Sequence, residues 1–364
     1  MSSFFSYIFL LFVLSPPCNN NNIHARTPIF AVNPNNISST PQNHNNNSYT
    51  WHDFEKFEDA SKGKLINGIF KLKKYFHKFG YLETEHITNS TDIFDSNLES
   101  AITRYQQRLG LRVTKKLDSN TLTEIMSPRC GVRDISSNTL KAGKKYAYFT
   151  SHPRWRRDIP MTLTYAFSPE NLIASLSRDD LRGAIKRAFG HWAKVIPVTF
   201  VESDDYGFAD IKIGFYAGDH GDGEAFDGVL GVLAHAFSPE SGRFHLDAAE
   251  TWAVDFEAET ARNAVDLESV ATHEIGHLLG LAHSGVKEAV MYPSLKPREK
   301  KVRLRVDDIR GVQSLYGSNP NFSLQGFSES DMSSSGGWSV AGEDGGLFYR
   351  VTYWVLVLVL WVCT

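Results

Sequence analysis

The sequence predicts an α+β protein in which a small bundle of three helices precedes a larger domain that combines one sheet with a few long helices. Two observations carry this prediction. Between residues 65 and 126, apolar side chains recur every three or four positions, which is typical of amphipathic helices. Beyond residue 148, short stretches that alternate apolar and polar residues are interleaved with longer helical patterns, so strands and helices share the second domain.

Each helix of the bundle has its own apolar face and its own boundary signal. Gly80 and Gly110 follow the first two helices, where a glycine commonly ends a helix. In the third, residues 118–126, Thr121 and Glu124 have the spacing of a capping box. The apolar faces of the first two helices are formed by Leu65, Ile69, Leu72 and Phe76, and by Leu98, Ile102, Tyr105 and Leu109.

The second domain opens with "MTLTYAF", which is typical of a strand, and a helix follows over residues 177–195 with Ser177 as its cap. Three further stretches have strand patterns: "VTFVE", "ADIKIGFY" and "VLGVLAHAF". A loop rich in glycine and aspartate separates the last two. The helix "VDLESVATHEIGHLLG" ends at Gly280, and a last helix, "VDDIRGVQSLYG", ends at Gly317.

The two ends of the chain differ in composition from the middle. An apolar run at residues 4–14 is too short to span a bilayer and predicts a signal peptide over residues 1–25. Residues 26–60, rich in Asn, Pro, Ser and Thr, are expected to form a disordered leader. A linker over residues 318–337 precedes a short apolar tail, residues 338–364, in a pattern typical of a GPI-anchor signal. A marginal membrane helix or a disordered apolar tail is the alternative.

Charge and sequons indicate where the protein acts. The net charge of −3 gives no reason to expect nucleic acid as a partner. Removal of both ends would leave Cys130 as the one remaining thiol, which is unusual in a secreted protein. We expect a monomer that is secreted to the extracellular matrix or held on the outer leaflet by a lipid anchor. Four glycosylation sequons agree with this route: Asn36, Asn46, Asn89 and Asn321.

The stretch "HEIGHLLGLAH" places three histidines in an otherwise apolar segment. His273 and His277 are four residues apart, so on a helix both imidazoles lie on one face, one turn apart. A sharp turn at Gly280 can bring His283 round as a third ligand. Three protein ligands leave one tetrahedral position open for water, as in a catalytic zinc site. Glu274 would take the proton of that water, whose pKa zinc lowers to about 7, and pass it to the leaving amine.

A buried helix with incidental histidines is the alternative interpretation. The full H-E-x-x-H-x-x-G-x-x-H spacing argues against it, because this spacing is the signature of the metzincin peptidases, in which a turn containing methionine follows downstream. The segment "AVMYP" supplies Met291, which we expect to form a packed floor beneath the zinc ligands.

Three motifs give the chain a resemblance to the matrix metalloproteinases, specifically to plant-type members without a hemopexin domain: "PRCGVRD", "HEIGHLLGLAHS" and "VDDIRGVQSLYG". The resemblance covers about residues 65–317. It implies a helical prodomain over residues 61–127 and a metzincin catalytic domain over residues 148–317. That domain would contain a twisted, mostly parallel sheet with an antiparallel edge strand, and three helices. Ser284, after the third histidine, favours this branch over other metzincins.

The activity implied by the resemblance is that of a latent zinc metalloendopeptidase, a hydrolase that cleaves peptide bonds in protein or peptide substrates. A catalytically inactive, metal-stabilised binding module is the alternative function. Glu274 argues against it, because a binding module does not need a general base.

The resemblance gives Cys130 a role within a cysteine-switch motif and activation linker, residues 128–147. A thiolate is a strong zinc ligand, so the Cys130 sulfur could fill the fourth position on the catalytic zinc and keep the zymogen silent. The family pattern implies that Arg129 and Asp134 pair to brace this loop, although Arg133 stands where the family usually has proline. A free thiol on a linker is the alternative.

Activation would require a cut between Gly131 and roughly Tyr148. The basic stretch "RWRR" at residues 154–157 resembles a convertase site, but it adjoins the first strand and is not expected to be the main cut. In the family, the new amino terminus pairs with an acidic residue of the last helix. Asp307 and Asp308 both remain candidates.

The resemblance also implies a structural zinc site and calcium sites. The structural zinc would have a closed tetrahedral shell of His220, Asp222, His235 and His245. One calcium ion would be bound by Asp227, Asp247 and Glu250 with backbone oxygens of the Gly228 loop. Asp210 matches a ligand of a second calcium site, but the partner loop of that site, between Pro239 and His245, is shortened, so its occupancy is left open.

The stretch "VLGVLAHAF" is expected to form an exposed edge strand beside the catalytic zinc, where an extended peptide can add its own backbone hydrogen bonds. The resemblance implies a pocket for a large apolar residue just after the cleaved bond, lined partly by the segment after Met291. The basic run at residues 296–305 would lie at its rim. We do not expect a C-terminal propeller domain or collagen unwinding.

Overall fold

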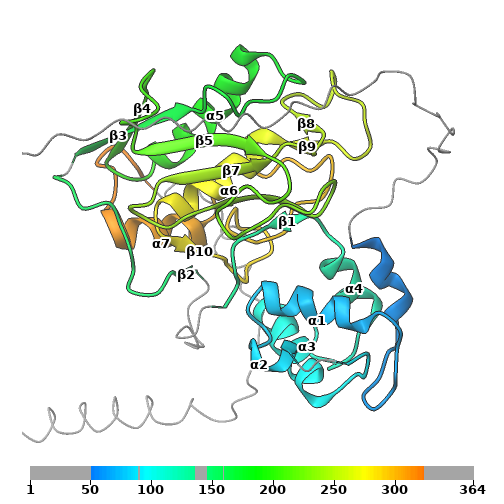
Figure 1. The fold of residues 1–364 in the computed structure, drawn as a ribbon. Coiled ribbons are helices and arrows are strands. Elements are labelled where there is room, and N and C mark those ends of the chain that lie inside the picture. The colour runs from blue at the N-terminus through cyan, green and yellow to red at the C-terminus, as the bar shows by residue number, and fades with distance from the viewer. Residues whose placement is uncertain (1–50, 89–90, 136–145, 159, 324–364) are drawn as a thin grey trace, which may run out of the picture. The chain divides into compact units, whose positions relative to one another are not determined.

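The computed structural model describes residues 51–88, 91–135, 146–158 and 160–323, all of which fall in one compact unit of the chain (Figure 1). The signal peptide, the leader up to residue 50, most of the activation linker and the anchor signal lie outside the described residues. So do the sequons at Asn36, Asn46 and Asn89. Among the helices of the described part, none is long and apolar enough to cross a membrane.

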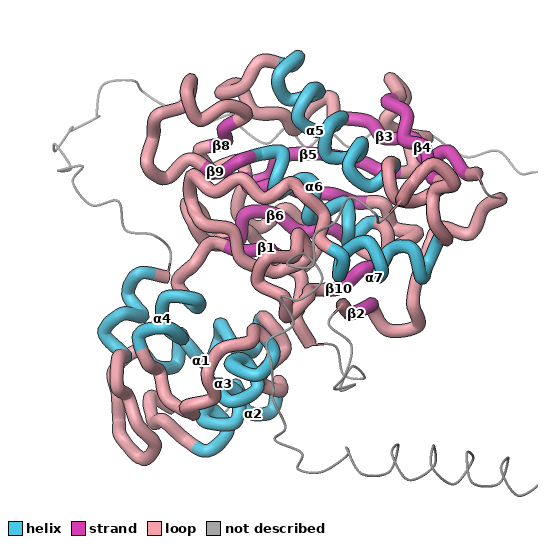
Figure 2. Tube along the Cα trace, turned by 180° about the vertical axis from the view of Figure 1, so that it is seen from behind, coloured by secondary structure: helices cyan, strands magenta, loops and turns pink. Residues whose placement is uncertain are grey.

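The N-terminal part is helical, and Figure 2 shows no strand among its helices. Its elements are η1 (His52–Phe57), α1 (Ile69–Lys78), α2 (Glu85–Thr88), α3 (Ser96–Arg108) and α4 (Ser119–Ile125). The three predicted helices correspond to α1, α3 and α4. Their apolar faces meet in one core, which includes the fully buried residues Leu72, Phe76, Leu98 and Ile102. Leu65, which we expected on the first of these faces, instead precedes α1 and is 77% exposed.

This helical part begins earlier than we expected. The leader was expected to extend to residue 60, but η1 buries Trp51, Phe54 and Phe57 in the core of the bundle. The Trp51 ring meets the Tyr75 ring edge-on, with centroids 5.1 Å apart. Aromatic side chains at a spacing of three residues supply the apolar surface that the Asn-rich stretch before them lacks.

The cap of the third helix also differs from the expected capping box. Asp118 accepts a hydrogen bond from the Thr121 amide at 2.9 Å and therefore caps α4. Thr121 is already inside the helix, and its hydroxyl also donates to Asp118, at 2.9 Å. Aspartate is a stronger N-cap than threonine, so the cap lies three residues upstream. Glu124 is thereby free to leave the helix surface, and its side chain reaches Ser294.

The sheet has six strands in the order β1-β6-β7-β5-β3-β4. They are β1 (Arg129–Cys130), β3 (Met161–Phe167), β4 (Val198–Glu202), β5 (Ile211–Tyr216), β6 (Val232–Ala236) and β7 (Arg243–Asp247). All neighbouring pairs are parallel except β6 with β7. The prediction of a mostly parallel sheet with one antiparallel strand is confirmed. However, β6 is not the edge, because β1 covers its outer side.

Strand β7 was not predicted. Its sequence, "RFHLD", carries two charged residues and a histidine in five positions, so it lacks the apolar character of a central strand. The register explains the pattern, because His245 lies directly opposite His235 of β6. The imidazoles of His235 and His245 therefore lie together instead of facing solvent.

Three helices accompany the sheet, as predicted: α5 (Arg178–Ala193), α6 (Leu267–Leu278) and α7 (Val306–Tyr316). Ser177 caps α5 as expected, with its hydroxyl accepting from the Asp180 amide at 3.1 Å. Trp192 of α5 donates its indole N–H to the Thr272 carbonyl of α6 at 2.8 Å, which fixes the two helices together. Two short strand pairs complete the fold: β2 (Ala147–Tyr148) with β10 (Leu281–Ala282), and β8 (Trp252–Ala253) with β9 (Val265–Asp266).

Candidate metal centres

Helix α6 and the turn after it bring three imidazoles together. The Nε2 atom of His277 lies 3.1 Å from that of His273 and 3.2 Å from that of His283. Gly280, with φ of +101°, turns the chain so that His283 returns toward the helix. The sulfur of Cys130 lies 3.4 Å from His277 Nε2, and the four ligand atoms all lie within 4.8 Å of one another.

The hydrogen bonds of the Nδ1 atoms determine which ring nitrogen of each imidazole carries the proton. Nδ1 of His273 lies 2.7 Å from the Val290 carbonyl, and Nδ1 of His277 lies 2.7 Å from the Leu281 carbonyl. A carbonyl only accepts, so both Nδ1 atoms carry the proton and both Nε2 atoms present a lone pair. Burial lowers the pKa of both rings well below the ordinary value, which keeps them neutral. Lone pairs that converge in this way repel one another unless a cation lies between them.

Strand β1 carries Cys130 into this centre. The Arg129 amide donates to the Gly231 carbonyl at 3.0 Å on one side, and the Cys130 amide donates to the Pro293 carbonyl at 2.9 Å on the other. The segment therefore runs between β6 and the stretch after Met291. Burial raises the pKa of the Cys130 thiol well above its ordinary value, and the nearby charge of Glu274 adds to this effect. A thiolate at this position thus requires a compensating cation, and zinc fits the donor set of three imidazoles and one sulfur.

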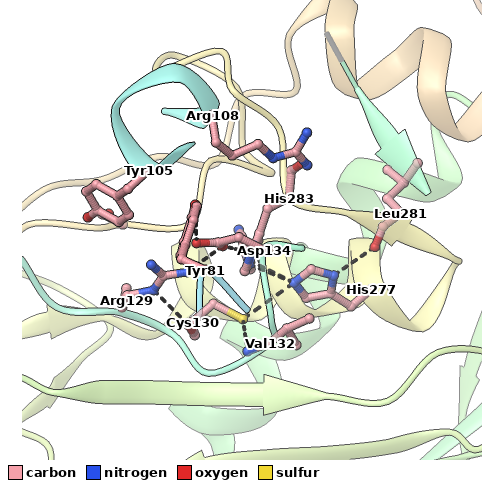
Figure 3. Close-up of polar contacts among 12 residues, drawn as sticks. Tyr81, Tyr105, Arg108, Arg129, Cys130, Val132, Asp134, His277, Leu281 and His283 are labelled. Carbon is pink, nitrogen blue, oxygen red and sulfur yellow. Dashed lines mark hydrogen bonds and ion pairs between the residues drawn. The ribbon is translucent and has the colours of Figure 1, made fainter. Parts of the chain in front are cut away.

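A second group joins the Cys130 segment to the histidines. The Asp134 carboxylate takes a hydrogen bond from Arg129 at 2.5 Å and lies 2.6 Å from Nδ1 of His283 (Figure 3). Tyr81 donates its hydroxyl to the other carboxylate oxygen at 2.8 Å. All four side chains are buried. Although burial alone would raise it, Arg129 and His283 hold the pKa of Asp134 well below its usual range, so the carboxylate stays charged.

The structure gives two further contacts to this centre that sequence reasoning missed. Arg108 of α3 donates to the His283 carbonyl at 2.6 Å, as Figure 3 shows. Glu124 of α4 accepts from the Ser294 hydroxyl at 2.5 Å, and both residues are buried. Arg108 stands in no recognisable motif, and Glu124 was expected only as part of a capping box, so neither contact could be predicted.

Glu274 is fully buried beside the histidines, and neither of its carboxylate oxygens has a hydrogen-bond partner among the described residues. Burial raises its pKa to about 8. A buried carboxyl group without a partner is costly in a folded protein and is most often found at functional sites. Its position fits a group that exchanges a proton with a small molecule at the metal.

Met291 lies under α6, where a Cβ atom on Gly276 would be only 2.2 Å from the methionine sulfur. Asp308 holds this turn, because its carboxylate accepts from the amides of Val290 and Met291 at 2.9 and 3.0 Å. Asp307 is only partly buried and accepts from the Ser284 hydroxyl at 2.7 Å. The two neighbouring aspartates, which the sequence did not distinguish, therefore have different surroundings.

A second cluster forms where β6, β7 and the loop before β6 meet. Oδ2 of Asp222 lies 2.8 to 2.9 Å from one ring nitrogen each of His220, His235 and His245. Nδ1 of His220 donates to the Gly218 carbonyl at 3.0 Å, so the Nε2 atom that faces Asp222 has a lone pair. Burial lowers the pKa of His235 and His245 to about 4. A lone pair directed at a carboxylate is stable when a cation lies between them, so this donor set also fits zinc.

The expected calcium ligands lie around the loop before β6. Asp227 accepts from the Val232 amide at 2.7 Å, and Asp247 accepts from the Gly228 amide at 3.3 Å. Glu250 accepts from the Leu230 amide at 2.7 Å through one oxygen, and its other oxygen is buried without a partner. Burial raises the pKa of Glu250 to about 8, against the effect of that amide, and Asp247 and Asp227 raise it further. Hard carboxylate oxygens with an unsatisfied charge fit calcium.

Asp210, the expected ligand of a second calcium site, has a different environment. Its carboxylate forms an ion pair with Arg157 and also accepts from the Thr164 amide at 2.8 Å. A guanidinium therefore lies where a metal ion would be needed. The residues present do not fit calcium at this position.

A cavity of about 20 Å³ lies beside Glu274. This volume holds about one water molecule, and Cys130 lines the cavity. Much of its wall is apolar, with a polar contribution from Lys301, a residue of the basic run. Its apolar lining includes Leu233, Val270, Val290, Tyr292 and Leu295.

Comparisons with known proteins agree with this geometry. The family model described as Matrixin matches residues 154–317, and one described as Putative peptidoglycan binding domain matches residues 67–125. Metalloendoproteinase 4-MMP of Arabidopsis thaliana is 54% identical over 293 residues, which cover 80% of this chain and 84% of the relative. Metalloendoproteinase 1-MMP of the same plant is 53% identical over 293 residues, covering 79% of each chain. Metalloendoproteinase 1 of Glycine max is 46% identical over 272 residues, covering 73% of this chain and 87% of the relative.

Proposed function

The chain belongs to the matrixin family of zinc metalloendopeptidases, and from this premise we propose that it is a secreted zymogen, silenced by Cys130, that cleaves extended segments of extracellular proteins or peptides. The observation that carries the proposal is the position of the Cys130 sulfur, 3.4 Å from His277 Nε2 within a four-atom cluster. The three imidazoles would hold a zinc ion there, and the Cys130 sulfur would occupy the position that water needs. Latency then lasts as long as residues 128–134 stay in place.

The chemistry follows from the orientation of the side chains. Bound zinc supplies a Lewis acid that makes water a nucleophile at neutral pH. The carbonyls of Val290 and Leu281 orient the rings of His273 and His277, so that their Nε2 lone pairs face the ion. Glu274 accepts the proton of the attacking water and returns it to the leaving amine. The Glu274 carboxylate is buried beside the histidines with no hydrogen-bond partner among the described residues, so it is positioned to exchange a proton there.

Removal of the switch segment opens a groove for substrate. In the zymogen, residues 129–131 lie between β6 and the stretch after Met291 and use backbone groups of both. Without them, β6 becomes the edge of the sheet, and a substrate in extended form can pair with it. The cavity beside Glu274, once Cys130 leaves, would receive a large apolar side chain next to the cleaved bond.

The surroundings of the last helix favour one partner for the new amino terminus. Asp308 is fully buried, and its carboxylate already accepts from the amides of Val290, Met291 and Arg305. Asp307 is partly accessible, and we assign it to the amino terminus created by activation. Tyr148 donates to the Gly311 carbonyl of α7 at 2.9 Å, so the stretch just after the proposed cut already lies beside that helix.

The remaining metal sites are assigned structural roles. Zinc held by the cluster around Asp222 would join the loop before β6 to strands β6 and β7. Calcium held by Asp227, Asp247 and Glu250, with the Gly228 loop, would fix the end of the same loop. Together with the catalytic ion, this gives two zinc ions and one calcium ion per chain.

The route and the organisation of the chain complete the proposal. We assign residues 1–25 to a signal peptide, residues 338–364 to a GPI-anchor signal after a linker from residue 318, and the product to the cell surface as a monomer. Asn321 is exposed, which suits glycosylation. The prodomain is extended upstream to residue 51 because η1 packs on its core, and the catalytic domain runs over residues 148–317.

The proposal is tested on purified zymogen with a quenched fluorescent peptide that has leucine after the scissile bond. A thiol-reactive mercurial should release cleavage that a zinc chelator then abolishes. Glu274→Ala should lower the released activity by at least about 100-fold while the zinc content stays unchanged. Full activity in this variant, or mercurial-induced activity that survives chelation, would refute the mechanism.

A further inference from the structure

Both carboxylate oxygens of Asp210, the residue before β5, accept hydrogen bonds from neighbouring donors. Arg157 binds both of its oxygens, with Nη1 at 3.0 Å from one and Nη2 in close contact with the other. Thr164 of β3 donates its amide at 2.8 Å and its hydroxyl at 3.0 Å to the same carboxylate. Although burial alone would raise it, the Arg157 hydrogen bonds hold the pKa of Asp210 below its ordinary value.

This arrangement excludes a calcium ion. Calcium requires six to eight oxygen ligands, whereas the partners of Asp210 offer N–H and O–H donors. A guanidinium has five donors and no acceptor, so it cannot share a carboxylate with a metal ion without repelling it. Arg156 and Lys212 line the same depression as Arg157, so three cations face the two carboxylates of Asp210 and Glu240 there.

The shortened hairpin between β6 and β7 packs directly against the backbone of Asp210. Gly242 adopts a φ of +67°, and a Cβ atom there would lie 1.9 Å from the Asp210 carbonyl oxygen. Its own carbonyl accepts from the Lys212 amide at 2.8 Å, so the hairpin is fastened to β5. Glu240 of the same hairpin accepts from the Arg156 amide at 3.0 Å. Its carboxylate therefore faces the 154–157 segment.

The segment that Arg157 belongs to is held at each of its residues. Arg154 donates to the Leu315 carbonyl at 2.9 Å, and the buried indole of Trp155 donates to the Leu278 carbonyl at 2.8 Å. These contacts reach α6 and α7, whereas Arg157 reaches β3 and β5. Arg157 thus attaches this segment to the sheet, through the ion pair with Asp210 and a hydrogen bond to the Thr162 carbonyl of β3 at 3.3 Å.

We propose that Arg157 acts as a built-in cation for Asp210, so that the start of the catalytic domain is attached to the sheet without calcium. The basic "RWRR" stretch thus fastens the start of the catalytic domain to the sheet and the helices behind it. The inference concerns Asp210 and does not depend on catalysis, and only its calcium control uses the proposed site at Glu250.

The test uses the full-length zymogen, dialysed free of calcium in buffer that contains zinc and then titrated with calcium. Native mass spectrometry counts the bound calcium ions, and thermal unfolding is followed at zero and saturating calcium. The variants are Asp210→Asn, Arg157→Met, the pair of both, and the charge-conserving Arg157→Lys. Arg156→Met is the matched control, because the Arg156 side chain is exposed and the hydrogen bond to Glu240 is made by the Arg156 backbone amide.

We expect Asp210→Asn to bind as many calcium ions as the parent protein, whereas Glu250→Gln binds one fewer. Arg157→Met should lower Tm by about 2 to 4 °C at both calcium levels, Arg157→Lys by less, and the double variant by no more than the worse single one. Loss of one calcium ion in Asp210→Asn, or Tm losses that simply add, would overturn the proposal. If Glu250→Gln binds as many calcium ions as the parent protein, the proposed calcium site at Glu250 is wrong. The inference on Arg157 does not depend on that site.

Discussion

Asp134 and His283 are 149 positions apart in the sequence, yet the Asp134 carboxylate lies 2.6 Å from Nδ1 of His283. The same carboxylate binds Arg129 and Tyr81, so it joins the helical part, the Cys130 segment and a proposed zinc ligand. Two contacts therefore hold the Cys130 segment in place: the Cys130 sulfur lies beside His277, and Asp134 lies beside the ring of His283. The proposed latency rests on more than the contact between the Cys130 sulfur and the metal site.

Asp134→Asn should weaken latency without touching the sulfur. Removal of one partner from a buried ion pair costs about 3 to 5 kcal/mol, because the Arg129 charge is left buried and unpaired. We expect the purified variant to cleave peptide slowly without mercurial and to unfold at a lower temperature. The measurement is the rate of spontaneous activation in the quenched-peptide assay.

Arg133→Ala is the control for this experiment, because Arg133 lies one position away and is exposed. It should remain as latent as the parent protein. If Asp134→Asn is equally latent, the carboxylate does not take part in latency.

Tyr81→Phe isolates the contribution of the helical part. The change removes a hydroxyl that donates to Asp134 at 2.8 Å and leaves the aromatic packing in place. One buried oxygen of Asp134 loses its partner, at a cost of about 1 to 3 kcal/mol. We expect latency between that of the parent protein and Asp134→Asn, measured as the mercurial concentration for half activation. An unchanged concentration would mean that the prodomain contributes nothing through this contact.

Cys130→Ser should be active without mercurial. A serine hydroxyl is a much weaker zinc ligand than a thiolate, and burial already opposes a negative charge at this position. Peptide cleavage by untreated protein is the measurement, and the same variant with Glu274→Ala is the matched inactive control. Silence of the single variant, with zinc present and the fold intact, would leave steric blocking by the helical part as the cause of latency.

The three histidines at the end of α6 could be predicted from the sequence, but the residues that contact them from other segments could not. Spacing alone placed His273 and His277 on one helical face, because the helix repeat is fixed by the backbone. The contacts of Asp134 and Arg108 with His283 join segments far apart in the chain, and local periodicity carries no information on such pairs. Strand β7 was missed for a related reason, since Arg243, His245 and Asp247 look like loop residues until their partners are known.

Glu268→Gln should produce a stability difference that depends on pH. Glu268 of α6 is buried and bound by His191 and Arg187 of α5 at 2.9 and 2.8 Å, and by Lys300 at 3.3 Å. Although burial opposes it, these partners lower the pKa of Glu268 from 4.5 to about 2. The shift corresponds to about 3 kcal/mol at most, and since Arg187 and Lys300 are about half exposed, we expect about 1 to 2 kcal/mol.

The sign follows from the lowered pKa. The folded protein favours the charged carboxylate, so its contribution is complete above pH 4.5 and disappears as the pH falls toward 2. The gap in unfolding free energy between parent and Glu268→Gln should narrow as the pH falls from about 5 toward 2. Denaturant unfolding at a series of pH values measures it, and a gap that widens in acid would contradict this origin.

Metal content distinguishes the two histidine clusters. The Nε2 lone pairs of His273 and His277 and that of His220 are each fixed by a hydrogen bond from the opposite ring nitrogen, so both clusters are expected to hold zinc. Native mass spectrometry of the zymogen should find two zinc ions, and His277→Ala and His235→Ala should each retain one.

The two variants should differ in the consequence of losing their zinc ion. His235→Ala removes a ligand that joins β6 to the loop before it, so Tm falls, whereas His277→Ala abolishes cleavage even after mercurial treatment. Two zinc ions in His235→Ala, or one in the parent protein, would show that the cluster around Asp222 is held together by hydrogen bonds alone.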